Sequence, residues 1–114
     1  LAEWQGTGSE FYTKFAGDPN RGGTLHIRET EELYTGTITA LDDKGNKEAV
    51  LRYLNGKYNG RISKWNLAGT LWNEAEYSRG ELVQITLKEG ELFNPNQIID
   101  LSEDSTKVSQ LFEE

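Results

Sequence analysis

The sequence predicts an all-β fold, an antiparallel meander of consecutive β-hairpins built from 24-residue repeats and followed by a short C-terminal helix. Three observations lead to this prediction: glycines and tyrosines that recur at a fixed spacing, turn dipeptides between β-rich runs, and a helical spacing of apolar residues near the end of the chain. The length of 114 residues is that of one small domain, so residues 1–114 are expected to form a single unit.

The repeat lies in the middle of the chain, where residues 34–57 and 58–81 align without a gap. Six residues of the first copy recur 24 positions later in the second: Tyr34, Gly36, Ile38, Gly45, Tyr53 and Gly56 are repeated as Tyr58, Gly60, Ile62, Gly69, Tyr77 and Gly80. A fixed period of this length indicates stacked copies of one supersecondary unit. A degenerate copy with one deletion is expected over about residues 11–33, because Phe11 and Phe15 precede their counterparts by 23 positions.

Each copy is predicted to form a β-hairpin. Asn55-Gly56 is the strongest short hairpin signal, and Lys44-Gly45 has turn chemistry between two β-rich runs. Two-residue turns at these places determine the register. The pairs expected opposite each other on one face are Ile38 with Leu51, Ile62 with Ala75, Tyr53 with Tyr58, Gly36 with Tyr53 and Gly60 with Tyr77. Because a tyrosine ring can shield the backbone that a facing glycine leaves bare, we interpret the tyrosines of the repeats as sheet-building residues.

The second face of the predicted sheet carries an apolar patch. The pairs expected there are Arg61 with Glu76, Ser63 with Glu74 and Trp65 with Trp72, and residues 82–87 add Val83, Ile85 and Leu87, with Leu87 beside Trp72. Large exposed apolar patches are uncommon in monomers, so this patch is expected to be covered. The spacing of Val108, Leu111 and Phe112 predicts a short covering helix within residues 102–114. Alternatively, the two tryptophans stay open as a recognition surface.

Charge and composition exclude several classes of protein. The formal net charge is −7, and residues 91–114 carry −5 of it because they hold six acidic side chains and one lysine. This acidic balance argues against binding to nucleic acid or anionic membranes, and no apolar run approaches the roughly 20 residues of a membrane-spanning helix. Without cysteine, the chain has no disulfide, thiol nucleophile or cysteine-ligated metal. We expect no cofactor, no nucleic-acid partner and no direct membrane insertion.

An enzymatic role has one candidate residue, His26, which is the only histidine. It could act as a general base with one of the glutamates in residues 29–32 orienting it, but a half-exposed strand residue is the simpler interpretation. Residues 42–46 lack the ligand spacing of a calcium loop, and Gln5-Gly6-Thr7-Gly8 lacks the strand–helix context of a nucleotide-binding loop. The sequence therefore predicts a protein that is not an enzyme.

The pattern Tyr-x-Gly … Gly … Tyr-x-x-Gly resembles MORN repeats, most of all their bacterial variant. The stretch Tyr-Leu-Asn-Gly-Lys-Tyr-Asn-Gly at residues 53–60 carries the resemblance, which covers residues 34–82, while Ser78-Arg79-Gly80-Glu81 departs from the usual Asn-Gly-Lys. The resemblance implies an elongated sheet of consecutive hairpins that contacts other proteins. Bacterial variants often occur in cell-envelope proteins, and some are labelled antitoxin-like components. It therefore implies an extracytoplasmic location, in the periplasm, in the envelope or secreted.

Two functions remain open from the sequence. The first is a non-catalytic structural or protein-interaction module with an unidentified protein partner, whose binding residues are predicted to be Arg61, Lys64, Trp65 and Trp72. The alternative is a small carbohydrate-binding module that uses the two tryptophans as stacking platforms, each aromatic contact contributing about 1 kcal/mol beyond its buried area.

Overall fold

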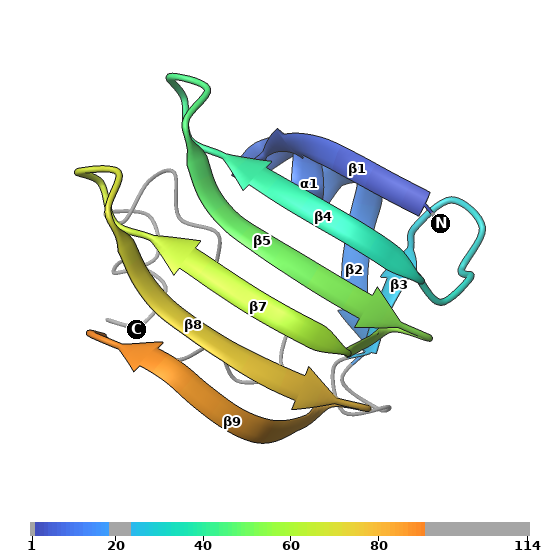
Figure 1. The fold of residues 1–114 in the computed structure, drawn as a ribbon. Helices are drawn as coiled ribbons and strands as arrows, with labels where there is room; N and C mark the ends of the chain where they lie inside the picture. The colour runs from blue at the N-terminus through green and yellow to red at the C-terminus, as the bar shows by residue number, and fades with distance from the viewer. Residues whose placement is uncertain (1, 19–23, 91–114) are drawn as a thin grey trace, which may run out of the picture.

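The computed structural model describes residues 2–18 and 24–90, and this part of the chain is mostly β-structure with one short helix (Figure 1). The elements in chain order are β1 (Ala2–Thr7), α1 (Gly8–Lys14), β2 (Phe15–Asp18), β3 (Thr24–Ile27), β4 (Gly36–Leu41), β5 (Lys47–Leu54), β6 (Lys57–Tyr58), β7 (Gly60–Trp65), β8 (Leu71–Ser78) and β9 (Glu81–Lys88). The predicted β class is confirmed. The helix predicted within residues 102–114 lies outside the described residues.

The main sheet has the strand order β1-β4-β5-β7-β8-β9, and the short β6 pairs with β5. From β4 to β9 the neighbours are antiparallel, but β1 pairs parallel with β4, so the expectation of a wholly antiparallel sheet is wrong at this edge. A parallel pair needs a long crossover connection. Here the crossover includes α1 and a separate two-stranded sheet, β2–β3, which lie behind the main sheet in Figure 1.

Helix α1 was not expected from the repeat pattern. It begins after Thr7, whose hydroxyl accepts the backbone N–H of Glu10 at 3.3 Å while the Glu10 carboxylate accepts the backbone N–H of Thr7 at 2.8 Å. This capping box satisfies donors at the helix start. Phe11, expected on a strand like its counterpart Tyr34, lies in this helix instead. Residues 5–8 therefore do lie at a junction between a strand and a helix, which was not expected for them. The Glu10 carboxylate already accepts the backbone N–H of Thr7 at this junction.

The five pairs predicted for the inner face of the hairpins are confirmed, but farther along β5 and β7 the register differs by two residues from the one these pairs imply, with Val50 opposite Ser63. The observed pairs are Gly36 with Tyr53, Ile38 with Leu51, Tyr53 with Tyr58, Gly60 with Tyr77 and Ile62 with Ala75. The reason for glycine at two of these places differs from the expected shielding by tyrosine. Gly36 and Gly60 have φ of 150° and 106°, which side chains rarely adopt, and a Cβ on Gly36 would lie 2.3 Å from the carbonyl oxygen of Ala2. These glycines are required by the backbone conformation.

The inner face of the sheet, defined by Ile38, Ala40, Ala49, Leu51, Tyr53, Tyr58, Ile62, Ala75 and Tyr77, is buried. A row of aromatic rings runs through this core. Its successive ring centroids lie 5.4 Å apart for Trp4–Phe15, 5.0 Å for Phe15–Tyr34, 6.2 Å for Tyr34–Tyr53, 5.3 Å for Tyr53–Tyr58 and 5.1 Å for Tyr58–Tyr77. Most are edge-to-face or tilted contacts, the geometry that aromatic pairs prefer. The interpretation of the tyrosines as sheet-building residues agrees with this burial.

The two longer hairpin turns are built alike. In the β4–β5 turn, the Asp42 carboxylate accepts the backbone N–H groups of Lys44 and Asn46, each at 2.9 Å. In the β7–β8 turn, 24 residues later, the Asn66 side-chain oxygen accepts those of Ala68 and Thr70 at 3.0 and 3.1 Å. Each of these side chains closes its turn, as Asx residues commonly do.

Candidate functional site

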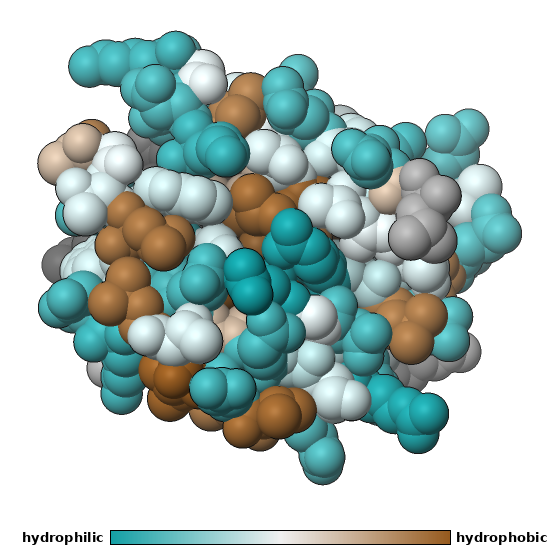
Figure 2. Space-filling model, viewed as in Figure 1, coloured by the Kyte–Doolittle hydropathy of each residue, from teal (hydrophilic) through white to brown (hydrophobic). Residues whose placement is uncertain are grey.

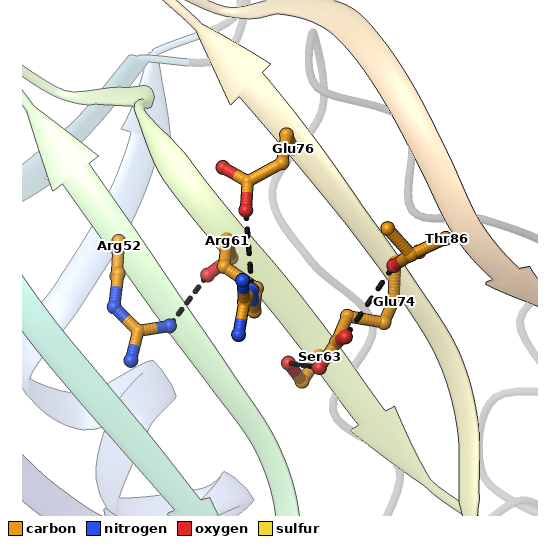
Figure 3. Close-up of polar contacts among 6 residues, drawn as sticks. All are labelled: Arg52, Arg61, Ser63, Glu74, Glu76 and Thr86. Atoms are coloured by element: carbon orange, nitrogen blue, oxygen red, sulfur yellow. Dashed lines mark hydrogen bonds and ion pairs between the residues drawn. The ribbon is translucent and has the colours of Figure 1, made fainter.

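The side of the main sheet opposite α1 carries two groups of hydrogen-bonded polar side chains, which together we call the outer face. It consists of Arg52 from β5, Arg61 and Ser63 from β7, Glu74 and Glu76 from β8, and Thr86 from β9 (Figure 3). Figure 2 shows the same side as Figure 1, with a hydrophilic band through its middle, hydrophobic patches along the left and lower margins and another hydrophobic patch close to the centre. The band lies on strands whose other side chains build the core, so its backbone is held rigidly in place.

Arg61 is the most prominent residue of this face. Its Nε lies 3.1 Å from Glu76 Oε1 across the β7–β8 ladder, and its backbone oxygen accepts a 2.7 Å hydrogen bond from Arg52 Nη1. The Arg61 side chain is nevertheless 57% exposed, against 35% for Glu76. The guanidinium is thus oriented by one carboxylate and keeps donors that face solvent. An exposed pair of this kind adds little to stability, about 0.2–1 kcal/mol.

Glu74 is the centre of the second group. Its carboxylate accepts the Ser63 hydroxyl at 3.1 Å and the Thr86 hydroxyl at 3.3 Å, and Thr86 Oγ1 also lies 2.8 Å from the Glu74 carbonyl oxygen. These contacts join β7, β8 and β9 on one face. Ser63 is buried and donates to a carboxylate, and no imidazole stands beside it in the described residues. This arrangement orders the surface and does not form a nucleophile–histidine pair.

The two tryptophans do not face each other, so the predicted Trp65–Trp72 pair is wrong. A β-bulge after Lys64 shifts the register and places Leu71 opposite Trp65. A bulge adds one residue to one strand and changes which side chains align across the pair. Trp65 has Lys47 Nζ 5.0 Å from its ring centroid, a cation–π contact that the sequence pattern did not indicate.

Lys64 and Trp72 lie apart from the outer face. Lys64 pairs with Asn73 and with Ala49, and both partners are buried on the inner side of the sheet. Its Nζ lies 5.7 Å from the Trp72 ring centroid, and that ring also contacts Gly90 closely. Of the four predicted binding residues, the structure therefore brings Arg61 and Trp65 to one face and groups Lys64 with Trp72 elsewhere. Side chains alternate between the two faces along β7, and Ile62 belongs to the inner face. The sequence therefore already indicated that Lys64 lies on the inner face and not with Arg61.

Strand β9 also departs from the expected register. Two bulges in the β8–β9 ladder place Ile85 opposite Ala75, on the inner side, and Leu87 opposite Glu74. Ile85 therefore does not share the outer face with Leu87, and Leu87 is not beside Trp72, whose carbonyl oxygen accepts the backbone N–H of Glu89 at 3.0 Å. The bulges break the two-residue alternation from which the prediction was made.

The catalytic candidate His26 lies on β3 in the small sheet, paired with Ala16 and bridged to Leu33. In residues 2–18 and 24–90, no hydrogen bond or ion pair joins it to a carboxylate. The same part of the chain contains no group of three or more His, Cys, Asp or Glu residues placed to hold a metal ion. It also contains no helix of sufficient length and apolar character to span a membrane. Comparisons with known protein families, with characterised proteins and with solved structures find no match.

Proposed function

We propose that this chain is a non-catalytic protein-interaction module of MORN-like repeats that binds a protein partner through the outer face. Recurrence of the same contacts at the repeat distance supports the repeat assignment. Asn55 N–H donates to Thr35 Oγ1 at 2.9 Å, and 24 residues later Arg79 N–H donates to Asn59 Oδ1 at 3.0 Å. The backbone N–H of Gly56 likewise donates to the carbonyl oxygen of Tyr34, and 24 residues later that of Gly80 donates to the carbonyl oxygen of Tyr58. Both hydrogen bonds are 2.8 Å long.

The observation that carries the proposed function is the oriented and exposed guanidinium of Arg61. Arginine is enriched at protein interfaces and at the few positions that dominate binding energy. Here the Glu76 carboxylate holds the guanidinium before any partner arrives, which lowers the entropy that binding must overcome. Trp65, at the end of the same strand, adds an aromatic surface.

A protein partner fits this geometry better than a carbohydrate. A sugar platform made of both tryptophans needs the two rings on one face, and the bulge after Lys64 separates them. The mixed charges of Arg61, Glu74 and Glu76 favour a polypeptide surface with charges of both signs. We keep the extracytoplasmic location as part of the same proposal, because it follows from the resemblance to bacterial MORN variants.

Site-directed photocrosslinking tests this proposal in cells that produce the protein. A photoreactive phenylalanine analogue replaces Gln84, an exposed residue opposite Glu76, or Lys14, an exposed residue of α1 on the other side of the sheet. We expect a discrete protein adduct from position 84 and none from position 14. Adding Arg61→Ala should reduce the adduct from position 84 about thirtyfold or more, since removing an interface hot spot costs about 2 kcal/mol or more.

Lys14→Ala is the matched control, because it removes one exposed positive charge without touching the outer face. It should leave the adduct from position 84 unchanged. An adduct from position 14 alone, or one from position 84 that is insensitive to Arg61→Ala, would contradict the proposal. Trp fluorescence titrations of the purified protein with oligosaccharides address the alternative, and saturable binding that Trp65→Ala abolishes would favour it.

A further inference from the structure

Strand β9 ends the main sheet of the described chain and has apolar side chains exposed at its edge. Leu82, Val83 and Ile85 are 45%, 65% and 44% exposed. Figure 1 places β9 at the margin of the sheet, and Figure 2 shows hydrophobic side chains gathered along the same margin. Edge strands with such side chains are the usual sites at which another strand adds to a sheet.

The charges at the two ends of β9 indicate which strand fits there. Glu81 begins the strand and Lys88 ends it, and both side chains are exposed. Neither forms an ion pair within the described part of the chain, where Glu81 lies opposite Ser78 and Lys88 opposite Asn73. When two copies of β9 run antiparallel, each Glu81 approaches the Lys88 of the other copy. A parallel arrangement would bring like charges together, which is unfavourable.

The bulges of β9 limit how many chains can associate. Val83 and Thr86 stand at the two bulges, outside the regular pairing with β8, and bulges bend a strand and increase its twist. A strongly twisted edge pairs over a short length. Antiparallel pairing of identical edges has two-fold symmetry, so both β9 edges are used up once two copies have met.

We propose that the edge of β9 is a self-association surface, which pairs antiparallel with β9 of a second copy and joins two main sheets into one. The exposed apolar side chains of Leu82, Val83 and Ile85 are covered in this dimer, and two Glu81–Lys88 pairs close its ends. This surface is separate from the outer face around Arg61 and does not depend on the function proposed for that face.

Charge reversal tests the pairing by sedimentation equilibrium of the full chain over a range of protein concentrations. Glu81→Lys and Lys88→Glu each replace two attractive pairs by two repulsive ones, and each should raise the dimer dissociation constant about tenfold or more. The double variant E81K/K88E restores opposite charges across the interface. Its dissociation constant should return to within about threefold of the original value.

Leu67→Glu is the control for a non-specific effect of adding charge in place of an exposed apolar residue. Leu67 is 93% exposed in the β7–β8 turn, away from β9, and this substitution should leave the dimer intact, as should Arg61→Ala. Val83→Glu should weaken the dimer while circular dichroism stays unchanged, because Val83 is already exposed in one chain. A monomer at all concentrations, or a double variant as weak as the single ones, would overturn the proposal.

Discussion

Replacing Gly36 by Ala tests whether β1 is held to the sheet through the close approach of this glycine. Gly36 and Gly60 occupy equivalent places at the start of β4 and β7, and both have positive φ. Their surroundings differ. A Cβ on Gly36 would lie 2.3 Å from the carbonyl oxygen of Ala2 in β1, whereas a Cβ on Gly60 would lie 3.4 Å from the flexible side chain of Arg52.

The two substitutions should therefore have different costs. Each introduces an alanine at a sparsely populated backbone conformation, at a cost of about 1–3 kcal/mol. Gly60→Ala should cost only that amount, because the Arg52 side chain can move. Gly36→Ala must also displace β1, which pairs with β4 over six residues and carries Trp4, whose ring packs 5.4 Å from Phe15. Partial loss of that packing adds about 2 kcal/mol.

The free energy of unfolding, from urea titrations followed by circular dichroism and tryptophan fluorescence, measures both costs. Gly45→Ala is the control for backbone strain alone, because Gly45 has φ of 86° and a Cβ added there would meet nothing within 4 Å. We expect Gly36→Ala to be the most destabilising, by about 2 kcal/mol more than Gly60→Ala. Equal losses at positions 36 and 60 would refute the reasoning that β1 is held at this point.

Four further predictions concern the core, the turns and pH. Leu51→Ala should lower the free energy of unfolding by about 2–5 kcal/mol, whereas Leu67→Ala in an exposed turn should change it by less than about 0.5 kcal/mol in the same urea titrations. Asn66→Ala should cost about 1 kcal/mol through its lost turn hydrogen bonds. The backbone N–H groups of Asn46 and Lys44 lower the pKa of the Asp42 carboxyl. The ionised Asp42 therefore stabilises the fold above the ordinary carboxyl pKa of 3.8, and this contribution is lost as pH falls through the lower pKa of the folded state. Thermal unfolding of Asp42→Asn should lack this acid dependence, and an unchanged dependence would contradict it. Burial raises the pKa of Tyr34, Tyr53, Tyr58 and Tyr77, so their contribution to stability is complete below the ordinary pKa of 10.0 and is lost as pH rises above it. Ultraviolet titration should show the ionisation of Tyr53 and Tyr58 delayed until the fold is lost, and ionisation of these two residues near pH 10.0 in the folded protein would contradict this.

The hairpin registers could be predicted because local chemistry determines them. A turn at Asn55-Gly56 aligns Tyr53 with Tyr58, but this register does not continue along the two strands, because Val50 lies opposite Ser63 and not opposite Arg61. The polar pairs Arg61–Glu76 and Ser63–Glu74 follow from the register of the β7–β8 hairpin, and both form hydrogen bonds. About half of the candidate site was thus within reach of sequence reasoning.

Bulges account for the part of the site that was predicted wrongly. The extra residue of the β7–β8 bulge is Trp72, which leaves Leu71 opposite Trp65, and the extra residue Val83 in β9 moves Ile85 to the inner side. Nothing in the composition of these strands marks the extra residue, because the energetic difference between a regular and a bulged pair depends on packing on both faces. The capping pair of Thr7 and Glu10 did mark the start of α1, but the helix is only seven residues long and has no apolar periodicity of its own.

The sequence by itself determined the antiparallel pairing within the hairpins β4–β5 and β7–β8 up to their bulges, since turn residues and two-residue alternation act over a few positions. Only the tertiary structure decided the parallel place of β1, the separation of Trp72 from Trp65 and the position of β9 at the sheet edge. These features depend on contacts between segments far apart in the chain or on how the sheet accommodates an extra residue. Local conformational preferences carry no information about long-range contacts or about the position of an extra residue. The free energy that selects these features comes from packing across the whole sheet.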